Sequence, residues 1–143
     1  MVAGLPKFAG SAARQRASSP KLQVLNTGLM SALSGQGFEQ AREDRPFWGR
    51  LVESAVGAHI FNSALSSRIE VFYWREGQHE VDFVLRRGGR VIAIEVKIGR
   101  RRDAMPGMEA FARLFEPARK LLVGGDGIPL REFLLAPLDH WMT

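Results

Sequence analysis

Two charged residues stand inside the most apolar segment of the chain and define the first candidate site. Glu95 and Lys97 belong to the run VIAIEVKI, residues 91–98. Side chains alternate between the two faces of a β-strand, so Glu95 and Lys97 share one face while Val96 points to the other. A strand this apolar is typical of a sheet interior, where an isolated charge is costly. The two charged residues therefore indicate either a catalytic site or a structural ion pair.

A second carboxylate is expected beside the first. Asp82 lies in EVDFVL, and the glycine pair at 88–89 predicts a hairpin between this segment and the apolar strand. Such a hairpin brings Asp82 close to Glu95, within a residue or two of register. A hard divalent cation such as Mg²⁺ relieves the repulsion of two carboxylates and acts as a Lewis acid in phosphodiester hydrolysis. Lys97 would then position the attacking water and balance negative charge, whereas the alternative is a structural ion pair of Lys97 with either acid.

A third acid is placed by a long predicted helix. Asp44 stands at an N-cap position, Pro46 lies just inside the start, and apolar residues continue to about Leu65. The helical neighbours of Glu53 on its own face are small or apolar, namely Gly49, Val56, Gly57 and Ile60. A carboxylate buried on such a face must be paired, protonated or bound to a metal. Glu53 is therefore a candidate for a further oxygen ligand.

The remaining patterns predict a mixed α/β domain. Residues 1–20 show no sustained periodicity and are predicted to form a flexible basic arm, while residues 21–143 are predicted to form a single domain. Strands are predicted over 21–25, 69–74, 80–85, 91–98 and 120–123, and helices over 27–33, 46–65, 103–115 and 130–135. This order describes a mixed β-sheet with helices packed on its faces.

Positive charge is concentrated in one part of the chain. The net charge is +5, from 20 Lys and Arg against 15 Asp and Glu. Residues 86–102 contain a single acid, Glu95, against seven basic residues: Arg86, Arg87, Arg90, Lys97, Arg100, Arg101 and Arg102. Such a concentration of positive charge is typical of proteins that bind polyanions, although clustered Arg also occurs on ordinary surfaces. The six arginines are therefore candidate nucleic-acid contacts.

Several classes of function are excluded by composition. The chain has 143 residues, the length of one domain, and no cysteine, which excludes disulfide scaffolds, thiolate zinc sites and cysteine nucleophiles. No run approaches the roughly 18 apolar residues of a membrane span, so no membrane partner and a cytoplasmic location are expected. The three histidines, His59, His79 and His140, lack metal-ligand spacing. No GxxxxGK[ST] loop is present, so no ATP site of that kind is expected.

The core pattern resembles the PD-(D/E)XK nuclease superfamily. Asp82, the Glu95-Val96-Lys97 triplet at the end of an apolar strand, and Glu53 on a preceding helix carry the resemblance, with Val81 in place of the proline. It implies a restriction-endonuclease-like mixed sheet flanked by helices. It also implies that Asp82 and Glu95 bind Mg²⁺ or Mn²⁺, that Lys97 is the catalytic lysine, and that Glu53 is an accessory catalytic and metal-binding acid.

A narrower resemblance covers nearly the whole chain from about residue 7. The blocks SPKLQVLNTGL, GRLVESAVGAHI, VFYWREGQHEVDFVL and IAIEVKIGRR are similar to the domain of unknown function that ends many prokaryotic AAA-type ATPases. This implies the C-terminal part of a longer protein, or a truncated relative, with an ATPase portion as a partner. The expected function is DNA binding with metal-dependent deoxyribonuclease activity. The alternatives are an inactive DNA-binding or partner-binding module and a pure protein-interaction domain.

Overall fold

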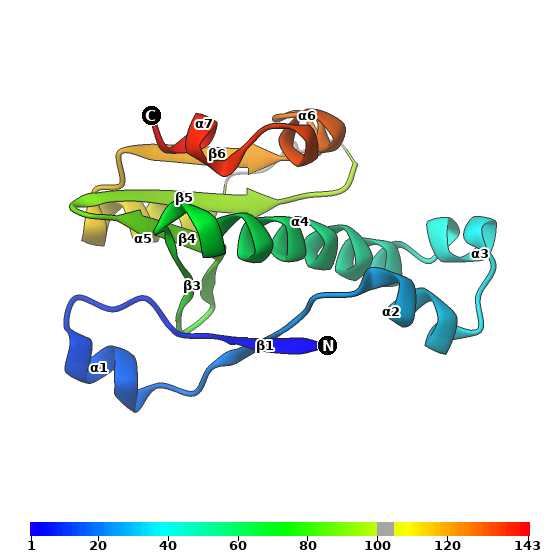
Figure 1. Ribbon diagram of the computed structural model, residues 1–143, viewed down its shortest axis with the longest axis horizontal. Coiled ribbons are helices and arrows are strands. Elements are labelled where there is room, and N and C mark those ends of the chain that lie inside the picture. Colours follow the sequence, from blue (N-terminus) through cyan, green and yellow to red (C-terminus); the bar gives the residue numbers. More distant parts are fainter. Residues whose placement is uncertain (100–104) are drawn as a thin grey trace.

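The computed structural model describes residues 1–99 and 105–143 and contains a small and a larger sheet (Figure 1). The elements in chain order are β1 (Val2–Leu5), α1 (Ala12–Ala17), β2 (Lys21–Val24), α2 (Thr27–Ser34), α3 (Phe38–Glu43), α4 (Arg45–Ser67), β3 (Glu70–Glu76), β4 (His79–Arg87), β5 (Arg90–Val96), α5 (Pro106–Phe115), β6 (Arg119–Val123), α6 (Leu130–Leu135) and α7 (Leu138–Met142). None of the described helices is long and apolar enough to cross a membrane.

The larger sheet confirms the predicted hairpin. Its strand order is β3-β4-β5-β6, with antiparallel pairing of β3 to β4 and of β4 to β5 and parallel pairing of β5 to β6. The strand that carries Glu95 is therefore an inner strand, as its apolar run predicts. It ends at Val96, and Lys97 follows directly, with its backbone N–H donating to the Val123 carbonyl at 2.9 Å.

Helices cover both faces of this sheet, and each face has its own core. On one face α4 packs with α6 and α7 over residues such as Phe83, Ile94 and Val123. On the other face α5 packs over Val84 and Ala93. The mixed sheet flanked by helices is thus confirmed, and Figure 1 shows α4 running along it. Both faces of β5 are buried, which accounts for its continuous apolar run.

The first twenty residues contain more regular structure than their sequence predicts. The segment predicted as an irregular arm contains β1 and α1. β1 pairs antiparallel with β2, and α1 lies between these two strands in the chain. Residues 6–8 also extend the edge of β3, because Tyr73 N–H donates to the Pro6 carbonyl at 3.1 Å and Phe8 N–H donates to the Tyr73 carbonyl at 2.7 Å. Short segments with glycine and proline lack a periodic signal, and their pairing depends on distant partners.

The starts of α2 and α4 agree with the predicted ranges, whereas α5 starts later than predicted. α4 begins as predicted, with the Asp44 carboxylate accepting from Phe47 N–H at 3.2 Å. α2 begins at Thr27, the first residue of the predicted range, and its cap is Asn26, whose side chain accepts from Leu29 N–H. α5 begins at Pro106, and residues 100–104, where its predicted start lies, are outside the described residues.

Candidate active site

Asp82 and Glu95 meet where β4 and β5 stop pairing. The last pair on this side of the ladder is Phe83 with Ile94, so the next residues outward, Asp82 and Glu95, lie across from each other. The backbone N–H of Val96 donates to Asp82 Oδ2 at 2.8 Å. This bond joins the side chain of Asp82 to the strand of Glu95. The structure therefore brings together the two carboxylates that the hairpin was predicted to align.

A β-bulge sets the direction of Asp82. Phe72 lies opposite Val84 and Trp74 lies opposite Val81, so β4 takes three steps where β3 takes two. The extra residue falls at Asp82 or Phe83. A bulge increases the local twist and redirects the side chains beside it. The hairpin was predictable from sequence, whereas this irregularity was not.

Glu95 is a nearly buried acid with one unsatisfied oxygen. Its side chain is 12% exposed, and its Oε1 accepts from Lys97 Nζ at 2.9 Å. Its Oε2 is buried and has no hydrogen-bond partner among the described residues. Buried carboxylate oxygens without a partner are costly, because desolvation is not compensated. Glu95 Oε2 is therefore a buried acceptor that no described residue satisfies.

The helix acid Glu53 joins the cluster through a residue that sequence reasoning missed. Lys21 Nζ donates to Glu53 Oε1 at 3.0 Å and to Glu80 Oε1 at 3.1 Å. Lys21 therefore links β2, α4 and β4. Its predicted strand was a usable signal, because alternation places Lys21 and the buried Gln23 on one face of β2. Nothing local in the sequence identified Glu53 and Glu80 as the partners of Lys21.

The charged groups of the site influence one another's ionisation. The pKa of Asp82 is raised from 3.8 to about 7, mainly by burial and also by the charges of Glu53 and Glu95. The Val96 hydrogen bond and the charge of Lys21 oppose this rise. Burial lowers the pKa of Lys97, but Glu95, Asp82 and Glu53 outweigh it, so the net pKa is raised. A carboxyl with a pKa near neutrality beside a firmly protonated ammonium is typical of a functional site.

A turn after β6 supports the backbone at Lys97. Gly124 has φ +79°, and a Cβ at this position would lie 2.2 Å from the Lys97 carbonyl oxygen. Only glycine both adopts this conformation without strain and permits the close approach. The GlyGlyAspGly segment, residues 124–127, is therefore packed directly against the backbone that follows β5.

The oxygen donors at Asp82 and Glu95 fit the hard divalent cation that the superfamily resemblance implies. Both are carboxylates, and Glu95 Oε2 has no hydrogen-bond partner within the described part of the chain. Over residues 1–99 and 105–143, no three Asp, Glu, His or Cys side chains form a ready-made ligand group. Glu53 is ion-paired to Lys21, so its part as a third ligand remains a prediction.

The three candidate nucleic-acid contacts that the structure describes, Arg86, Arg87 and Arg90, are not gathered beside the acids. Arg87 and Arg90 face each other at the turn of the β4–β5 hairpin, whereas Glu95 lies five residues further along β5, a rise of about 17 Å. Arg86 is bound to Glu70 at 2.7 Å, with its guanidinium 4.9 Å from the Phe72 ring, and Arg87 is ion-paired to Asp139. Arg90 is exposed. The predicted contacts at Arg100, Arg101 and Arg102 lie outside the described residues.

His59 and two aromatic residues of β3 have structural contacts. His59 Nε2 lies 3.3 Å from the Ala136 carbonyl and packs edge-on against Phe133. Phe72 and Trp74 are buried in the core on the α5 face. His59, Phe72 and Trp74 therefore contribute to packing.

Comparison with known proteins places the chain in a family. The family described as Domain of unknown function (DUF4143) matches residues 48–133, which include Glu53, Asp82, Glu95 and Lys97. An uncharacterized protein of Mycobacterium bovis and one of Mycobacterium tuberculosis are each 31% identical over 146 residues, covering 96% of this chain. The chain spans about a third of the length of these curated relatives. No solved structure matches it.

Proposed function

Because the chain belongs to the family of domains of unknown function DUF4143, we propose its function from its own residues: a nucleic-acid-binding domain that hydrolyses phosphodiester bonds with Mg²⁺ or Mn²⁺. The observation that carries the proposal is the buried Oε2 of Glu95, which has no hydrogen-bond partner among the described residues. The other oxygen of this carboxylate is ion-paired to Lys97, and the next residue, Val96, donates its backbone N–H to Asp82. This arrangement supports a restriction-endonuclease-like site of the PD-(D/E)XK type.

Each residue has a distinct part in the proposed reaction. Asp82 and Glu95 would hold the divalent cation, which when bound supplies Lewis-acid stabilisation of charge on the phosphate. Lys97, about half exposed, presents its ammonium to a water or a phosphate oxygen while it remains tied to Glu95. One water is consumed. Its oxygen bonds to phosphorus as the ester P–O bond breaks, one proton ends on the leaving oxygen, and the other is released.

The exposed Arg90 and the basic run at 100–102 support DNA as the polyanion, and the resemblance to ATPase-linked domains supports an ATPase portion as the partner. The chain covers only a third of its relatives, which is consistent with a larger assembly. The partner need not act on the acids directly. It would deliver or move the nucleic acid over this domain.

One observation favours an inactive binding module as the second candidate. Lys21 bridges Glu53 and Glu80, so a protein cation already neutralises part of the acid cluster. In that case the acids and lysines form a structural network, and the domain binds DNA or a partner without cleaving it. The two candidates differ in what divalent ions do to the protein and to DNA.

A cleavage assay separates the two candidates. The purified chain is incubated with duplex, single-stranded and branched DNA in Mg²⁺ or Mn²⁺, with an EDTA control and the Glu95→Gln variant in parallel. The proposal expects metal-dependent cutting by the wild type and none by Glu95→Gln, because the variant removes a charged oxygen ligand. Equal cutting by both proteins identifies a contaminant. Failure of the wild type on every substrate, repeated on the longest protein that carries this domain, overturns the enzyme proposal.

A further inference from the structure

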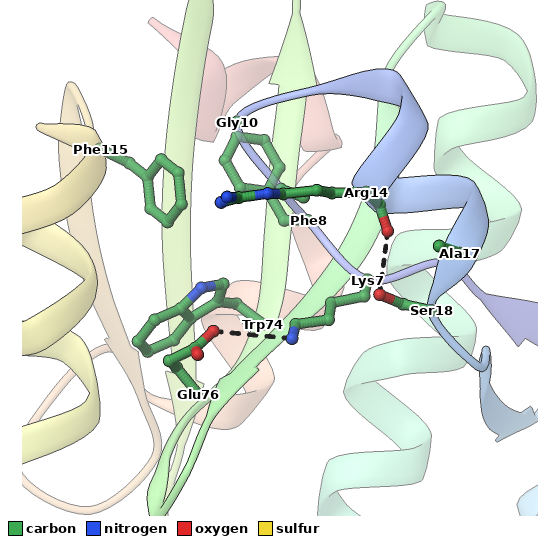
Figure 2. A pocket seen from close by; sticks show the side chains of 10 residues that line it. Lys7, Phe8, Gly10, Arg14, Ala17, Ser18, Trp74, Glu76 and Phe115 are labelled. Carbon is green, nitrogen blue, oxygen red and sulfur yellow. Dashed lines mark hydrogen bonds and ion pairs between the residues drawn. The ribbon is translucent and has the colours of Figure 1, made fainter.

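A pocket of about 460 Å³ lies apart from the acid cluster, between the N-terminal segment and the edge of the larger sheet (Figure 2). Its walls come from residues 7–18, from β3 and from the end of α5. The side chains that determine its chemistry are Lys7, Phe8, Arg14, Trp74, Glu76 and Phe115. A volume of this size is within the range of pockets that take small ligands.

Backbone and side-chain hydrogen bonds fix the pocket on both sides. The Phe8 N–H donates to the Tyr73 carbonyl at 2.7 Å, after which the chain leaves the sheet edge to form α1. The chain returns at Ser19, whose carbonyl accepts from Tyr73 Oη at 2.7 Å. The segment 9–18 therefore arches over the edge of β3, and the space beneath the arch is the pocket. These bonds shape the pocket before any ligand arrives.

One wall of the pocket is aromatic. The Phe8 and Phe115 rings meet edge to face with centroids 5.0 Å apart, and Trp74 lies 6.3 Å from Phe115. Phe8 and Trp74 are held in the core, whereas Phe115 is half-buried. Aromatic rings contact the flat faces and edges of nucleobases without selecting a particular base. The wall thus suits a planar ring.

The pocket also presents one uncommitted positive charge. Lys7 is ion-paired to Glu76 at 3.7 Å, which leaves these two side chains neutral as a pair. The guanidinium of the exposed Arg14 makes no hydrogen bond or ion pair with any described residue. Figure 2 shows the Arg14 side chain extending across the pocket, beside the Phe8 ring and toward Phe115. Guanidinium is the side-chain group best shaped for phosphate.

We infer that this pocket binds one nucleotide unit of single-stranded DNA, with the base against Phe115, which packs on Phe8 and Trp74, and its phosphate on Arg14. The inference extends the proposed nucleic-acid binding to a specific subsite. Trp74 pairs with Val81, the residue before Asp82, so the pocket and the acid cluster belong to the same β3–β4 hairpin. A strand held in the pocket is thereby anchored near the acids without occupying them.

Arg14→Ala and its matched control Arg16→Ala test the phosphate contact. Both residues are exposed on α1, but Arg16 does not line the pocket. The probe is a fluorescein-labelled oligothymidylate of about eight nucleotides, titrated in EDTA so that no cleavage occurs. Loss of a charge-assisted contact weakens binding about tenfold for Arg14→Ala, while Arg16→Ala changes it less than about twofold. Equal losses in both variants, or no binding by the wild type, overturn the inference.

An abasic oligomer with the same number of phosphates tests the base contact. The wild type is expected to bind oligothymidylate several-fold more tightly than the abasic oligomer, and Phe115→Leu is expected to reduce this preference. Equal affinity of the wild type for the two oligomers overturns base binding. Thermal melting confirms that each variant is folded, and the exposed Arg14 site keeps the test valid if Phe115→Leu unfolds.

The binding test of the pocket can fail or succeed independently of the cleavage test of the proposed function. Binding in EDTA does not require the metal or the carboxylates. A chain that fails to cut DNA but loses oligothymidylate affinity in Arg14→Ala retains the pocket and loses the enzyme proposal. A chain that cuts DNA equally well in Arg14→Ala and Arg16→Ala, with equal oligothymidylate affinity, retains the enzyme proposal and loses the pocket.

Discussion

At the scale of single residues, Asp82 carries the most perturbed ionisation in the cluster. Burial is the main cause that raises its pKa, and the charges of Glu53 and Glu95 add to the rise, while the Val96 N–H and the charge of Lys21 oppose it. A group whose pKa rises on folding binds a proton more tightly in the folded state than in the unfolded chain. The folded protein is therefore stabilised by protonation of Asp82, and that contribution has a definite pH range.

The pH dependence of stability follows from the Asp82 pKa. The contribution is fully present below the ordinary pKa of 3.8 and is lost as pH rises through about 7. In Asp82→Asn, which can still accept the Val96 N–H, this loss is absent. The melting temperature of the variant minus that of the wild type should therefore grow between these pH values, by an order of several degrees, and then level off. Melting curves in EDTA that stay parallel across this range would contradict the assignment.

Lys21 is the second residue whose role the structure reveals. Its ammonium bridges Glu53 and Glu80, and these two acids outweigh the effect of burial and raise its pKa. Its charge also stabilises ionised Asp82. The Lys21 ammonium thus neutralises part of the negative charge that a bound metal ion would otherwise neutralise.

Lys21→Met should strengthen divalent-ion binding at the acid cluster. Removal of a nearby positive charge favours a cation electrostatically by an order of 1 kcal/mol or more at partly buried positions, equivalent to several-fold in the dissociation constant. Mn²⁺ affinity measured by calorimetry checks this, with Lys7→Met as a control because Lys7 pairs with Glu76 away from the cluster. Weaker Mn²⁺ binding in Lys21→Met would instead identify Lys21 as a residue that holds Glu53 in position.

At the scale of elements, the attachment of β2 to α4 determines where Lys21 lies. Gln23, on the same face of β2, is buried and donates through Nε2 to the carbonyls of Val24 at 2.7 Å and Ser54 at 3.1 Å. Gly57 makes room for it, since a Cβ at Gly57 would lie 2.3 Å from Gln23 Oε1. The helix face of small and apolar residues around Glu53 is therefore the surface against which β2 packs.

Gly57→Ala should destabilise the protein although alanine is the better helix former. The new methyl group displaces the Gln23 amide and costs buried hydrogen bonds, about 1–3 kcal/mol. Gly49→Ala in the same helix is the matched control, because its Cβ would only touch Ile98 at 3.6 Å, and it should stabilise by about 0.5–1 kcal/mol. Denaturant unfolding of both variants checks the difference. A stabilised Gly57→Ala would show that Gln23 is not packed as described.

Local patterns predicted the elements well and their contacts poorly. The α4 start follows from Asp44 and Pro46, and the β4–β5 hairpin follows from alternation around the glycine pair, because both signals are local. The Lys21 bridge joins residues 32 and 59 positions apart, and no local pattern encodes such a pairing. Likewise, no local pattern predicted that Arg86 pairs with Glu70 and Arg87 with Asp139. Counting the arginines in the sequence therefore overestimated the positive charge available to a nucleic acid.

At the scale of the whole molecule, the three features considered for nucleic-acid binding lie at different places around the β3–β4–β5 strands. They are the acids Asp82 and Glu95, the hairpin turn with Arg87 and Arg90, and the pocket lined by Phe8, Trp74 and Phe115. The acids lie at one end of the β4–β5 ladder and Arg90 at its turn, while the pocket lies at the β3 edge. A nucleic acid that reached all three would cross the domain rather than touch a single patch. The acids are the only one of these features whose proposed role is chemical.

The cleavage rate of Lys97→Ala, with Mn²⁺ affinity measured on the same sample, tests the central claim most directly. Lys97 acts on the water or phosphate rather than on the metal, so the variant should retain Mn²⁺ binding and lose cleavage by about 10²-fold or more. Lys120→Ala, an exposed lysine on β6, should cut DNA at the wild-type rate. Cleavage by Lys97→Ala at the wild-type rate would contradict the claim and leave Glu95 and Lys97 as a structural ion pair.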